Sequence, residues 1–411
     1  MGKIPLKRLV PGLIIGPASW LGPYIVCVSL FLPTMIQHLD SENKVSLVAL
    51  FSTCAMIVAS ISNMVAGSLS DRTASKYGKR TPWIVVGGFF FMLCMIGAAF
   101  APNIPILLVV WMLGQVALNF IVAPMVAWID MAPENSGGTA SSAYGGLGMA
   151  LGNNGFTVLG AYFLGQYKLG FIVFGIVAFL GTLLSVLIVK EPSNEYEKIE
   201  KNNAEKSTSF WKEVKHIFPK WSVGRDYYLA LIGKMLQGIA NFMITGYLLY
   251  IMTDFLNQSS SQTQGTIQKL NLIMLVFGIL CGLLAGPLSD KFHLLKIPVA
   301  LSTIFLGVGA LSIYFLQNDI SIVIYGFMAG LGMGIWNSLD GLLNIKIIPD
   351  RDRVAFFLGV YNLGASLTQA IAPVLAAIMI SMFGFQSIFL VSFVFAMIAG
   401  ICIIMIKQVK L

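Results

Sequence analysis

The sequence predicts an all-α membrane protein with twelve transmembrane helices, arranged as two pseudo-symmetric six-helix bundles around a central cavity. Three observations support this prediction. Of the 411 residues, 57% are hydrophobic and only 11% are charged, whereas soluble domains carry about 25% charged residues. The apolar residues gather in runs long enough to span a bilayer. A short charged motif near position 70 also recurs near position 290. This composition excludes a soluble enzyme, and no enzymatic activity is expected.

A membrane helix needs about 20 mostly apolar residues. The first six runs that meet this criterion are 12–37, 45–69, 82–101, 105–130, 138–166 and 169–189. The second six are 226–255, 266–289, 297–317, 320–346, 353–383 and 385–407. The runs lack the two-residue alternation of a membrane barrel, so helices are expected throughout. The first run is too long for the core of a signal peptide and is expected to remain as a span.

The spans define an N-terminal bundle at 1–189, a cytoplasmic linker at 190–225 and a C-terminal bundle at 226–411. The linker is polar and mixed in charge, as a solvated tether would be, with a short amphipathic helix expected around 210–218. Lys and Arg mark the cytoplasmic side of a membrane protein. With both termini in the cytoplasm, only Lys44, Lys168 and Lys269 lie outside. This bias explains the net charge of +8 without a nucleic-acid partner, and we expect a multi-pass protein of the cell membrane.

Cysteine, histidine and glycine patterns provide no sign of a bound cofactor. All five cysteines lie in apolar runs, where they are typical of small hydrophobic residues. The three histidines form no ligand cluster, and no GxxxxGK[ST] nucleotide-binding loop is present. We therefore expect neither a metal nor a cofactor, and any transport would draw its energy from gradients.

Two pairs of loops indicate an internal duplication. GSLSDRTASKYGKR at 67–80 lies between the second and third spans, and GPLSDK at 286–291 begins the equivalent loop between the eighth and ninth. The segment from Met131 also aligns with the segment from Ile347, matching Pro133 with Pro349. Two parallel six-helix repeats are a known transporter architecture.

Through its twelve spans, central linker and repeated loops, the chain resembles the major facilitator superfamily over nearly its whole length. SDRTASKYGKRTPW and LGVYNLGASLTQAIAP are further similar to the sucrose-transporter-like and glycoside–pentoside–hexuronide carriers. The resemblance implies alternating access around a cavity lined by spans 1, 4, 7 and 10. Cation-coupled sugar carriers of that branch place carboxylates in span 2. Here span 2 has no acid before Asp71, so sodium coupling is not expected.

The resemblance also implies that the repeated loop closes the cytoplasmic gap between the two halves. Asp71 could cap the N-terminus of a helix from the other half, and a basic residue of its loop, Arg72, Lys79 or Arg80, could pair with Asp130. Alternatively, the basic residues only orient the chain. That rule is indifferent to Asp, so the recurrence of an acid in both copies favours a gate. The predicted gate residues are Gly67, Asp71, Arg72, Lys79, Arg80, Asp130, Gly286, Asp290 and Lys291.

Two ionisable residues lie well inside predicted spans, Lys234 in the seventh and Asp340 in the tenth. Each would cost about 2.5–3.5 kcal/mol at the centre of a bilayer, so they should face water or each other. We predict that they approach each other across the cavity. Such a pair could merely fix one helix against the other, or it could bind substrate or a proton, or act as a gate. Asp340 is the best proton site because it is the only acid well inside a span.

Polar and aromatic residues on the cavity-lining spans complete the predicted substrate site. They are Gln237, Asn241, Asn337, Trp336, Gln115, Asn119, Trp20 and Tyr24. For any single residue, ordinary hydrogen bonding between helices is an alternative. Amide groups beside aromatic faces suit a neutral hydroxylated solute such as a sugar, although amino acids, nucleosides and polar drugs would also fit.

These features favour a secondary active transporter for a small polar solute, with proton-coupled sugar symport as the leading hypothesis and a monomer as the simplest state. An exporter of drugs or amphipathic lipids is a second hypothesis, left open by the 20 Met and 28 Phe. A membrane sensor that transports nothing is a third. Direction of transport and substrate do not follow from the sequence.

Overall fold

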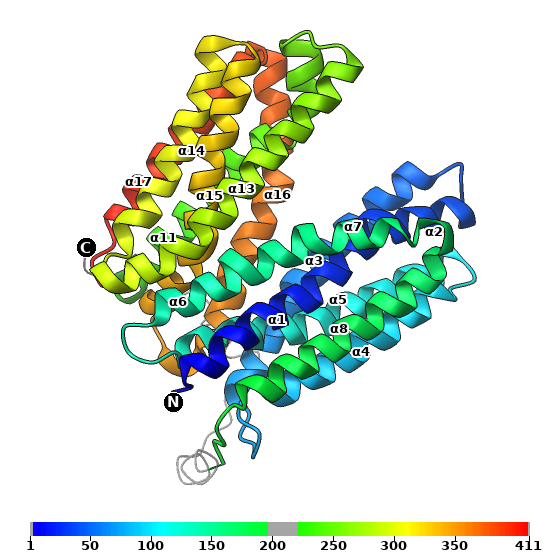
Figure 1. The fold of residues 1–411 in the computed structure, drawn as a ribbon, viewed down its shortest axis with the longest axis vertical. Coiled ribbons are helices and arrows are strands. Elements are labelled where there is room, and N and C mark those ends of the chain that lie inside the picture. The colour runs from blue at the N-terminus through cyan, green and yellow to red at the C-terminus, as the bar shows by residue number, and fades with distance from the viewer. Residues whose placement is uncertain (1–2, 196–220, 410–411) are drawn as a thin grey trace. The chain divides into compact units, whose positions relative to one another are not determined.

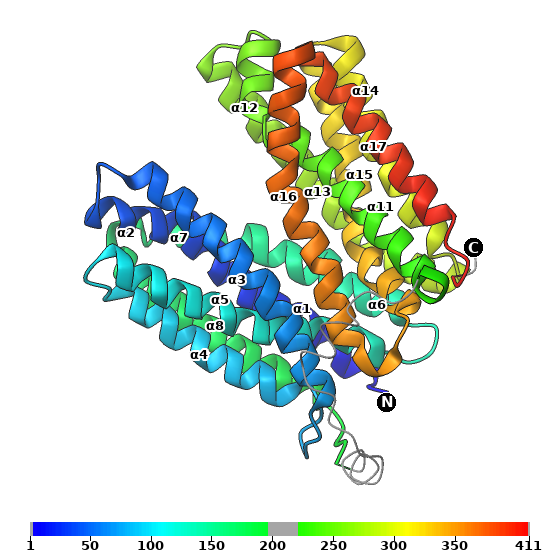
Figure 2. The ribbon, with the colours of Figure 1, turned by 180° about the vertical axis from the view of Figure 1, so that it is seen from behind.

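The computed structural model describes residues 3–195 and 221–409, and every regular element within them is a helix. The chain forms two compact units, each treated separately below (Figures 1 and 2). The first unit comprises Met1–Ile217 with Asp350–Val360, and the second comprises Phe218–Pro349 with Tyr361–Leu411. The short helix expected around 210–218 lies outside the described residues.

The first unit contains the first six spans. Its helices are α1 (Leu6–Val26), α2 (Leu32–Leu39), α3 (Lys44–Arg72), α4 (Thr81–Ala99), α5 (Ile104–Val126), α6 (Gly137–Ser141), α7 (Phe156–Ala161) and α8 (Tyr167–Val189). A π-helical turn, Cys27–Phe31, joins α1 to α2. Helix α1 packs against α8, α4 packs against both α5 and α8, and α3 packs against α5. The six spans thus form one bundle.

The fifth span is irregular because glycines replace the side chains that would otherwise separate it from α1. Two π-helical stretches, Ser142–Gly148 and Leu151–Gly155, lie between α6 and α7. A Cβ atom at Gly148 would lie only 2.7 Å from the carbonyl oxygen of Leu13. The absence of a side chain at this position therefore allows the two backbones to pack directly.

The second unit contains the other six spans. Its helices are α11 (Trp221–Thr245), α12 (Leu248–Tyr250), α13 (Ser260–Phe292), α14 (Lys296–Leu316), α15 (Asp319–Ile347), α16 (Val354–Phe383) and α17 (Gln386–Ile404). Helix α15 packs against α13 and α14, and α17 packs against α14 and α11. Helix α16 is continuous, although its first residues, up to Val360, belong to the first unit by their contacts.

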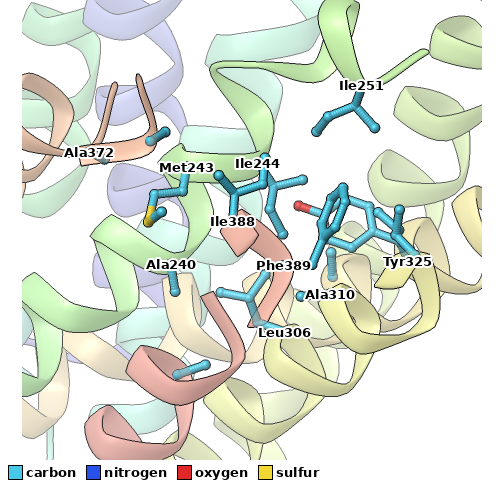
Figure 3. Packing of buried hydrophobic residues seen from close by; sticks show 14 of the residues in the cluster. Ala240, Met243, Ile244, Ile251, Leu306, Ala310, Tyr325, Ala372, Ile388 and Phe389 are labelled. Carbon is cyan, nitrogen blue, oxygen red and sulfur yellow. The ribbon is translucent and has the colours of Figure 1, made fainter. Parts of the chain in front are cut away.

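Apolar side chains from α11, α13, α14, α15, α16 and α17 fill the interior of the second unit (Figure 3). Met243 and Ile244 of α11 meet Leu306 of α14, Tyr325 of α15 and Phe389 of α17, and all five are buried. Because lipid tails are as apolar as these side chains, close packing between the helices, and not removal from water, stabilises this cluster. This cluster supports the helices that carry the polar residues described below.

Large apolar side chains also cover the outer faces of the helices. Leu272 and Leu284 of α13 are 61% and 57% exposed, and Val374 of α16 is 60% exposed. Such broad apolar surfaces are rare on soluble proteins and indicate contact with lipid. Within the described residues, ten helices are long and apolar enough to cross a membrane. The other two predicted spans are the glycine-rich fifth and the seventh, which includes the charged residues Asp226 and Lys234. The chain is an all-α, multi-pass membrane protein.

Candidate functional site

Lys234 of α11 and Asp340 of α15 form an ion pair inside the second unit. Lys234 Nζ lies 2.8 Å from Asp340 Oδ2, and the two side chains are only 13% and 9% exposed. The close approach expected from the sequence is therefore present. Each charge compensates the other in a place where an isolated charge would be costly.

A tyrosine from a third helix completes this pair. The hydroxyl of Tyr361 on α16 donates a hydrogen bond to Asp340 Oδ1, whereas Lys234 binds the other carboxylate oxygen, Oδ2. Lys234 Nζ also lies 4.1 Å from the centre of the Tyr361 ring, a cation–π contact. Residues Lys234, Asp340 and Tyr361 are called the triad below. It links α11, α15 and α16 through one carboxylate.

Buried amides on the same helices have hydrogen-bonding capacity to spare. Asn344 lies four residues after Asp340 on the same helical face and is fully buried, yet within the described part of the chain neither of its amide atoms has a hydrogen-bond partner. The Oδ1 atom of buried Asn241 is also unpaired there. Leaving a buried polar group unpaired costs about 1–3 kcal/mol. A polar ligand or water molecule could satisfy these groups.

The other predicted residues of α11 and α15 differ in their surroundings. Gln237 is buried, and its Nε2 donates to the sulfur of Met333 over 3.3 Å. Trp336 is buried, whereas its neighbour Asn337 is exposed. The structure thus brings Lys234 and Asp340 into direct contact but does not place Asn337 in the same buried setting.

The first unit has a polar cluster of its own. Asn119 of α5 accepts a hydrogen bond from Asn63 of α3 and donates one to the carbonyl of Gln115, both over 2.8 Å. The indole nitrogens of Trp20 and Trp111 are buried and have no partner among the described residues, whereas the Gln115 side chain has the Tyr24 hydroxyl as a partner. Tyr24 stacks on Trp111 with ring centres 6.3 Å apart. Four predicted residues therefore lie in a buried region that includes unpaired donors and aromatic faces.

The loop at 67–80, called the gate loop below, holds a buried carboxylate against the start of α16. Asp71 Oδ2 accepts a hydrogen bond of 3.0 Å from the backbone N–H of Phe356, the third residue of that helix. Asp71 Oδ1 lies 2.5 Å from Arg80 Nη1, and both side chains are 3% exposed. A carboxylate at a helix N-terminus satisfies a free N–H group and interacts favourably with the helix dipole.

Asp130 pairs with Arg351, and not with a basic residue of the gate loop as the sequence suggested. Arg80 pairs with Asp71 and donates to Ser70 Oγ over 2.8 Å, and Asp130 Oδ1 instead lies 3.4 Å from Arg351 Nη1. The reason is that Arg80 is needed to neutralise the buried Asp71. Of the other gate residues in this loop, Gly67 is buried, Lys79 is half-buried and Arg72 is exposed.

The second copy of the motif ends α13. Gly286 is buried, Asp290 is half-buried and Lys291 is exposed, with its ammonium 5.6 Å from the ring centre of Phe292. Ser289 donates from its hydroxyl to the carbonyl of Leu294, which closes the short turn before α14. The shared letters therefore correspond to two loops of different length.

Two residues just after the sixth span hold the gate loop from the other side. The carboxylate of Glu191 accepts hydrogen bonds from the backbone N–H of Thr81 at 2.8 Å and of Arg80 at 3.1 Å. Asn194 accepts from the backbone N–H of Ser75 and donates to the carbonyl of Thr73, both at 2.9 Å. Both Glu191 and Asn194 are buried. The start of the segment expected to be a solvated tether is thus part of the first unit.

Three of these contacts could not be found from the sequence. A single tyrosine in an apolar run, such as Tyr361, is typical of a packed core residue. Glu191 begins a polar segment in which most charges are expected to face water. Arg351 lies far from Asp130 in the sequence, and only the alignment of the two loop pairs hinted that both segments border the same side.

The fold and the buried charged and amide groups are those of a multi-pass membrane protein with polar sites inside its helix bundles. The sequence identifies the family, because the Major Facilitator Superfamily model matches residues 19–255 and 230–410. The chain therefore belongs to the Major Facilitator Superfamily of membrane transporters, and both its fold and its family are those of proteins that bind small-molecule substrates.

Similar proteins of known name differ in what they transport. The multi-drug resistance efflux pump PmrA of Streptococcus pneumoniae is 22% identical over 396 residues, 90% of each chain. The E. coli fucose:proton symporter FucP has a TM-score of 0.74 at 13% identity, covering 98% of this chain and 99% of its own. The proton:xylose symporter XylE has a TM-score of 0.67 at 15% identity, covering 98% and 96%. At these identities the solved structures show the shared twelve-helix fold.

Proposed function

We propose that the protein is a proton-coupled symporter of a small polar solute, with a sugar or glycoside favoured, that works by alternating access. The observation that carries this proposal is the buried ion pair of Lys234 and Asp340. A proton taken up by Asp340 would neutralise its carboxylate and leave the Lys234 ammonium without its counter-ion. Proton binding would therefore change the charge of the site, as coupling to a gradient requires.

The amide and aromatic groups support the choice of solute. Asn241 and Asn344 offer unpaired amide atoms in buried surroundings, and Tyr24 with Trp111 offers aromatic faces. Hydroxyl groups of a sugar can satisfy both amide donors and acceptors. Two proteins of similar fold are sugar:proton symporters by name, which supports the same choice.

The gate loop fits a role in closing the cytoplasmic side. The Asp71 contact with the start of α16 and the Arg80–Asp71 pair would be made in one state of the transport cycle and released in another. Asp130 with Arg351 would add a weaker, partly exposed contact. The other gate residues in this proposal are Gly67, Arg72, Lys79, Gly286, Asp290 and Lys291. Under it both termini are cytoplasmic, the cell membrane is the location and a monomer suffices.

The experiment is a flux screen with purified protein in proteoliposomes under an imposed pH gradient. Labelled sugars and glycosides are compared with labelled amino acids and nucleosides. Asp340→Asn should abolish gradient-driven accumulation of the transported solute. Asp319→Asn, the same change at the first residue of α15, where the side chain accepts a hydrogen bond from Gln258 that asparagine can also accept, should behave like the wild type. Unchanged accumulation in Asp340→Asn would remove Asp340 from coupling.

Drug export is the second candidate because PmrA, which is similar to this chain in sequence, is a multi-drug resistance efflux pump by name. The cavity of an exporter would be more apolar, and the buried amides would not be needed. In whole cells, export predicts faster loss of a fluorescent dye on expression of the protein, whereas symport predicts uptake of a labelled sugar. Dye loss without sugar uptake would favour export, and neither flux would favour a sensor.

A further inference from the structure

Helix α16 holds both the gate contact and the triad within its first two turns. The backbone N–H of Phe356 binds Asp71, and Tyr361 binds Asp340 and Lys234. Five residues separate these two points, or about 7.5 Å along the helix axis. The helix is continuous from Val354 to Phe383, and the division between the two units falls between Val360 and Tyr361.

Between these two points, α16 also packs tightly on α3. A Cβ atom at Gly359 would lie 3.0 Å from Met64 Cα and 3.1 Å from the carbonyl oxygen of Asn63. The glycine therefore allows direct backbone contact. With this support on one side and the Asp71 bond before it, the start of α16 is held in one position by polar and packing contacts to α3. Movement of α16 at Tyr361 would therefore disturb both the hydrogen bond to Asp71 and the packing at Gly359.

Within the described residues, the side chains that contact Asp340 come from two helices. They are the Lys234 ammonium from α11 and the Tyr361 hydroxyl from α16, and Tyr227 of α11 lies next to Tyr361 with ring centres 6.4 Å apart. The neighbouring helices α13 and α14 carry few charged residues within their described lengths. These are Lys269, Asp290 and Lys291 on α13 and Lys296 on α14.

We propose that Tyr361 is the positioning residue that transmits the protonation of Asp340 to the cytoplasmic gate. When the Asp340 carboxylate takes up a proton from water it becomes a neutral carboxylic acid. Its bonds to the Lys234 ammonium and the Tyr361 hydroxyl then lose their charge assistance, which about halves the strength of such bonds. The start of α16 is freed to shift, and the Asp71 bond to Phe356 breaks. This inference rests on the proposed role of Asp340 as the proton site.

Hydrogen–deuterium exchange of the peptide covering 350–360 tests the link without knowledge of the solute. In the wild type, the exchange rate of this peptide, divided by its intrinsic exchange rate at the same pH, should rise on acidification by about 2- to 30-fold, the factor that corresponds to the loss of one helix cap. Asp340→Asn should give the high ratio at both neutral and acidic pH. If Asp71 itself takes up the proton that releases the contact, Asp340→Asn will keep the full response to pH, and the proposal is overturned.

Two replacements of Tyr361 separate its hydroxyl from its ring. Tyr361→Phe keeps the ring against Lys234 and removes only the bond to Asp340, so the pH response of 350–360 should be lost while solute exchange in the absence of a gradient persists. Tyr361→Leu removes both contacts and should also slow the exchange of solute in the absence of a gradient. Tyr325→Phe is the matched control, because this buried tyrosine of α15 has a hydroxyl without a partner among the described residues.

The outcomes separate this proposal from the proposed function. If the wild type accumulates a solute on a pH gradient but Tyr361→Phe retains the full exchange response of 350–360, the inference about Tyr361 is wrong and the function stands. If no solute moves with protons, yet the response follows Asp340 and Tyr361, the link stands and the function is wrong. A Tyr361→Phe variant in which hydrogen–deuterium exchange rises across the whole second unit at every pH would show that Tyr361 has a purely structural role and would overturn the proposal.

Discussion

Removal of Lys234 alone should destabilise the protein far more than removal of Lys234 and Asp340 together. In Lys234→Met, the carboxylate of Asp340 loses an ammonium 2.8 Å away while it remains buried, and only the Tyr361 hydroxyl is left to bind it. Removing one partner of a buried ion pair costs about 3–5 kcal/mol. In Lys234→Met/Asp340→Leu no charge is left behind, and such replacements are neutral or stabilising by about 1–4 kcal/mol.

The thermal unfolding midpoint in detergent, followed by tryptophan fluorescence, provides the measurement. For a unit of 150–250 residues, 1 kcal/mol corresponds to about 2–4 °C. The single variant should therefore unfold about 6–20 °C below the wild type, and the double variant at or above the wild-type midpoint. Lys269→Met, which removes an exposed lysine of the second unit, is the control and should shift the midpoint by no more than about 2 °C.

The comparison also tests the reasoning that placed the pair at the centre of the site. Suppose that Lys234→Met and Asp340→Leu, made separately, each lower the unfolding midpoint, and that these two decreases add up in the double variant. The two charges would then not depend on each other, and the contact between Lys234 Nζ and Asp340 Oδ2 would contribute nothing to stability. If Lys234→Met matches Lys269→Met, the carboxylate is well solvated in the absence of the lysine. Either result would contradict a dry, closed ion pair and would favour a site that is already open to water.

Three further changes probe the gate loop and the fifth span. Asp71→Ala should speed proteolysis at 350–360, because the α16 N-terminus loses a cap worth about 0.5–2 kcal/mol. Glu191→Ala should speed tryptic cleavage of the gate loop, because the backbone N–H groups of Arg80 and Thr81 lose their acceptor, whereas the exposed Glu195→Ala should not. Gly148→Ala should lower the unfolding midpoint by an amount equivalent to about 1–3 kcal/mol, because its Cβ would meet the backbone of α1. Gly165→Ala, with nothing within 4 Å, should leave the midpoint unchanged.

The spans were predictable because lipid imposes a simple length and composition on a helix. The run 320–346 corresponds to Asp319–Ile347, and 45–69 to Lys44–Arg72. The interruption of 226–255 after Thr245 was not predicted, because the residues there are as apolar as those of a continuous helix. Amino-acid composition therefore predicts whether a helix lies in lipid, but it does not predict where the backbone of that helix is interrupted.

Contacts were predictable only where burial leaves few choices. A lysine and an aspartate in two spans need compensation, and each is the obvious partner for the other, so the pairing of Lys234 with Asp340 follows from cost alone. Their roles in substrate binding and coupling stay predictions. Tyr361 gave no such signal, because an aromatic ring packs equally well without its hydroxyl. The partner of Asp130 was missed because Arg80, which is closer in sequence, is bound by Asp71.

The burial of the gate-loop charges bears on the two explanations that the sequence left open for them. A basic residue that only orients the chain needs no buried partner and can be exposed, as Lys76 is. Arg80 and Asp71 are only 2% and 4% exposed, and burying two charges is costly unless both are well paired. Topology does not account for that cost. A role in holding the start of α16 does, because the buried pair orients the Asp71 oxygen that binds Phe356. The same reasoning predicts that neutralising the exposed Lys76 will leave the gate intact, whereas neutralising Arg80 will release it.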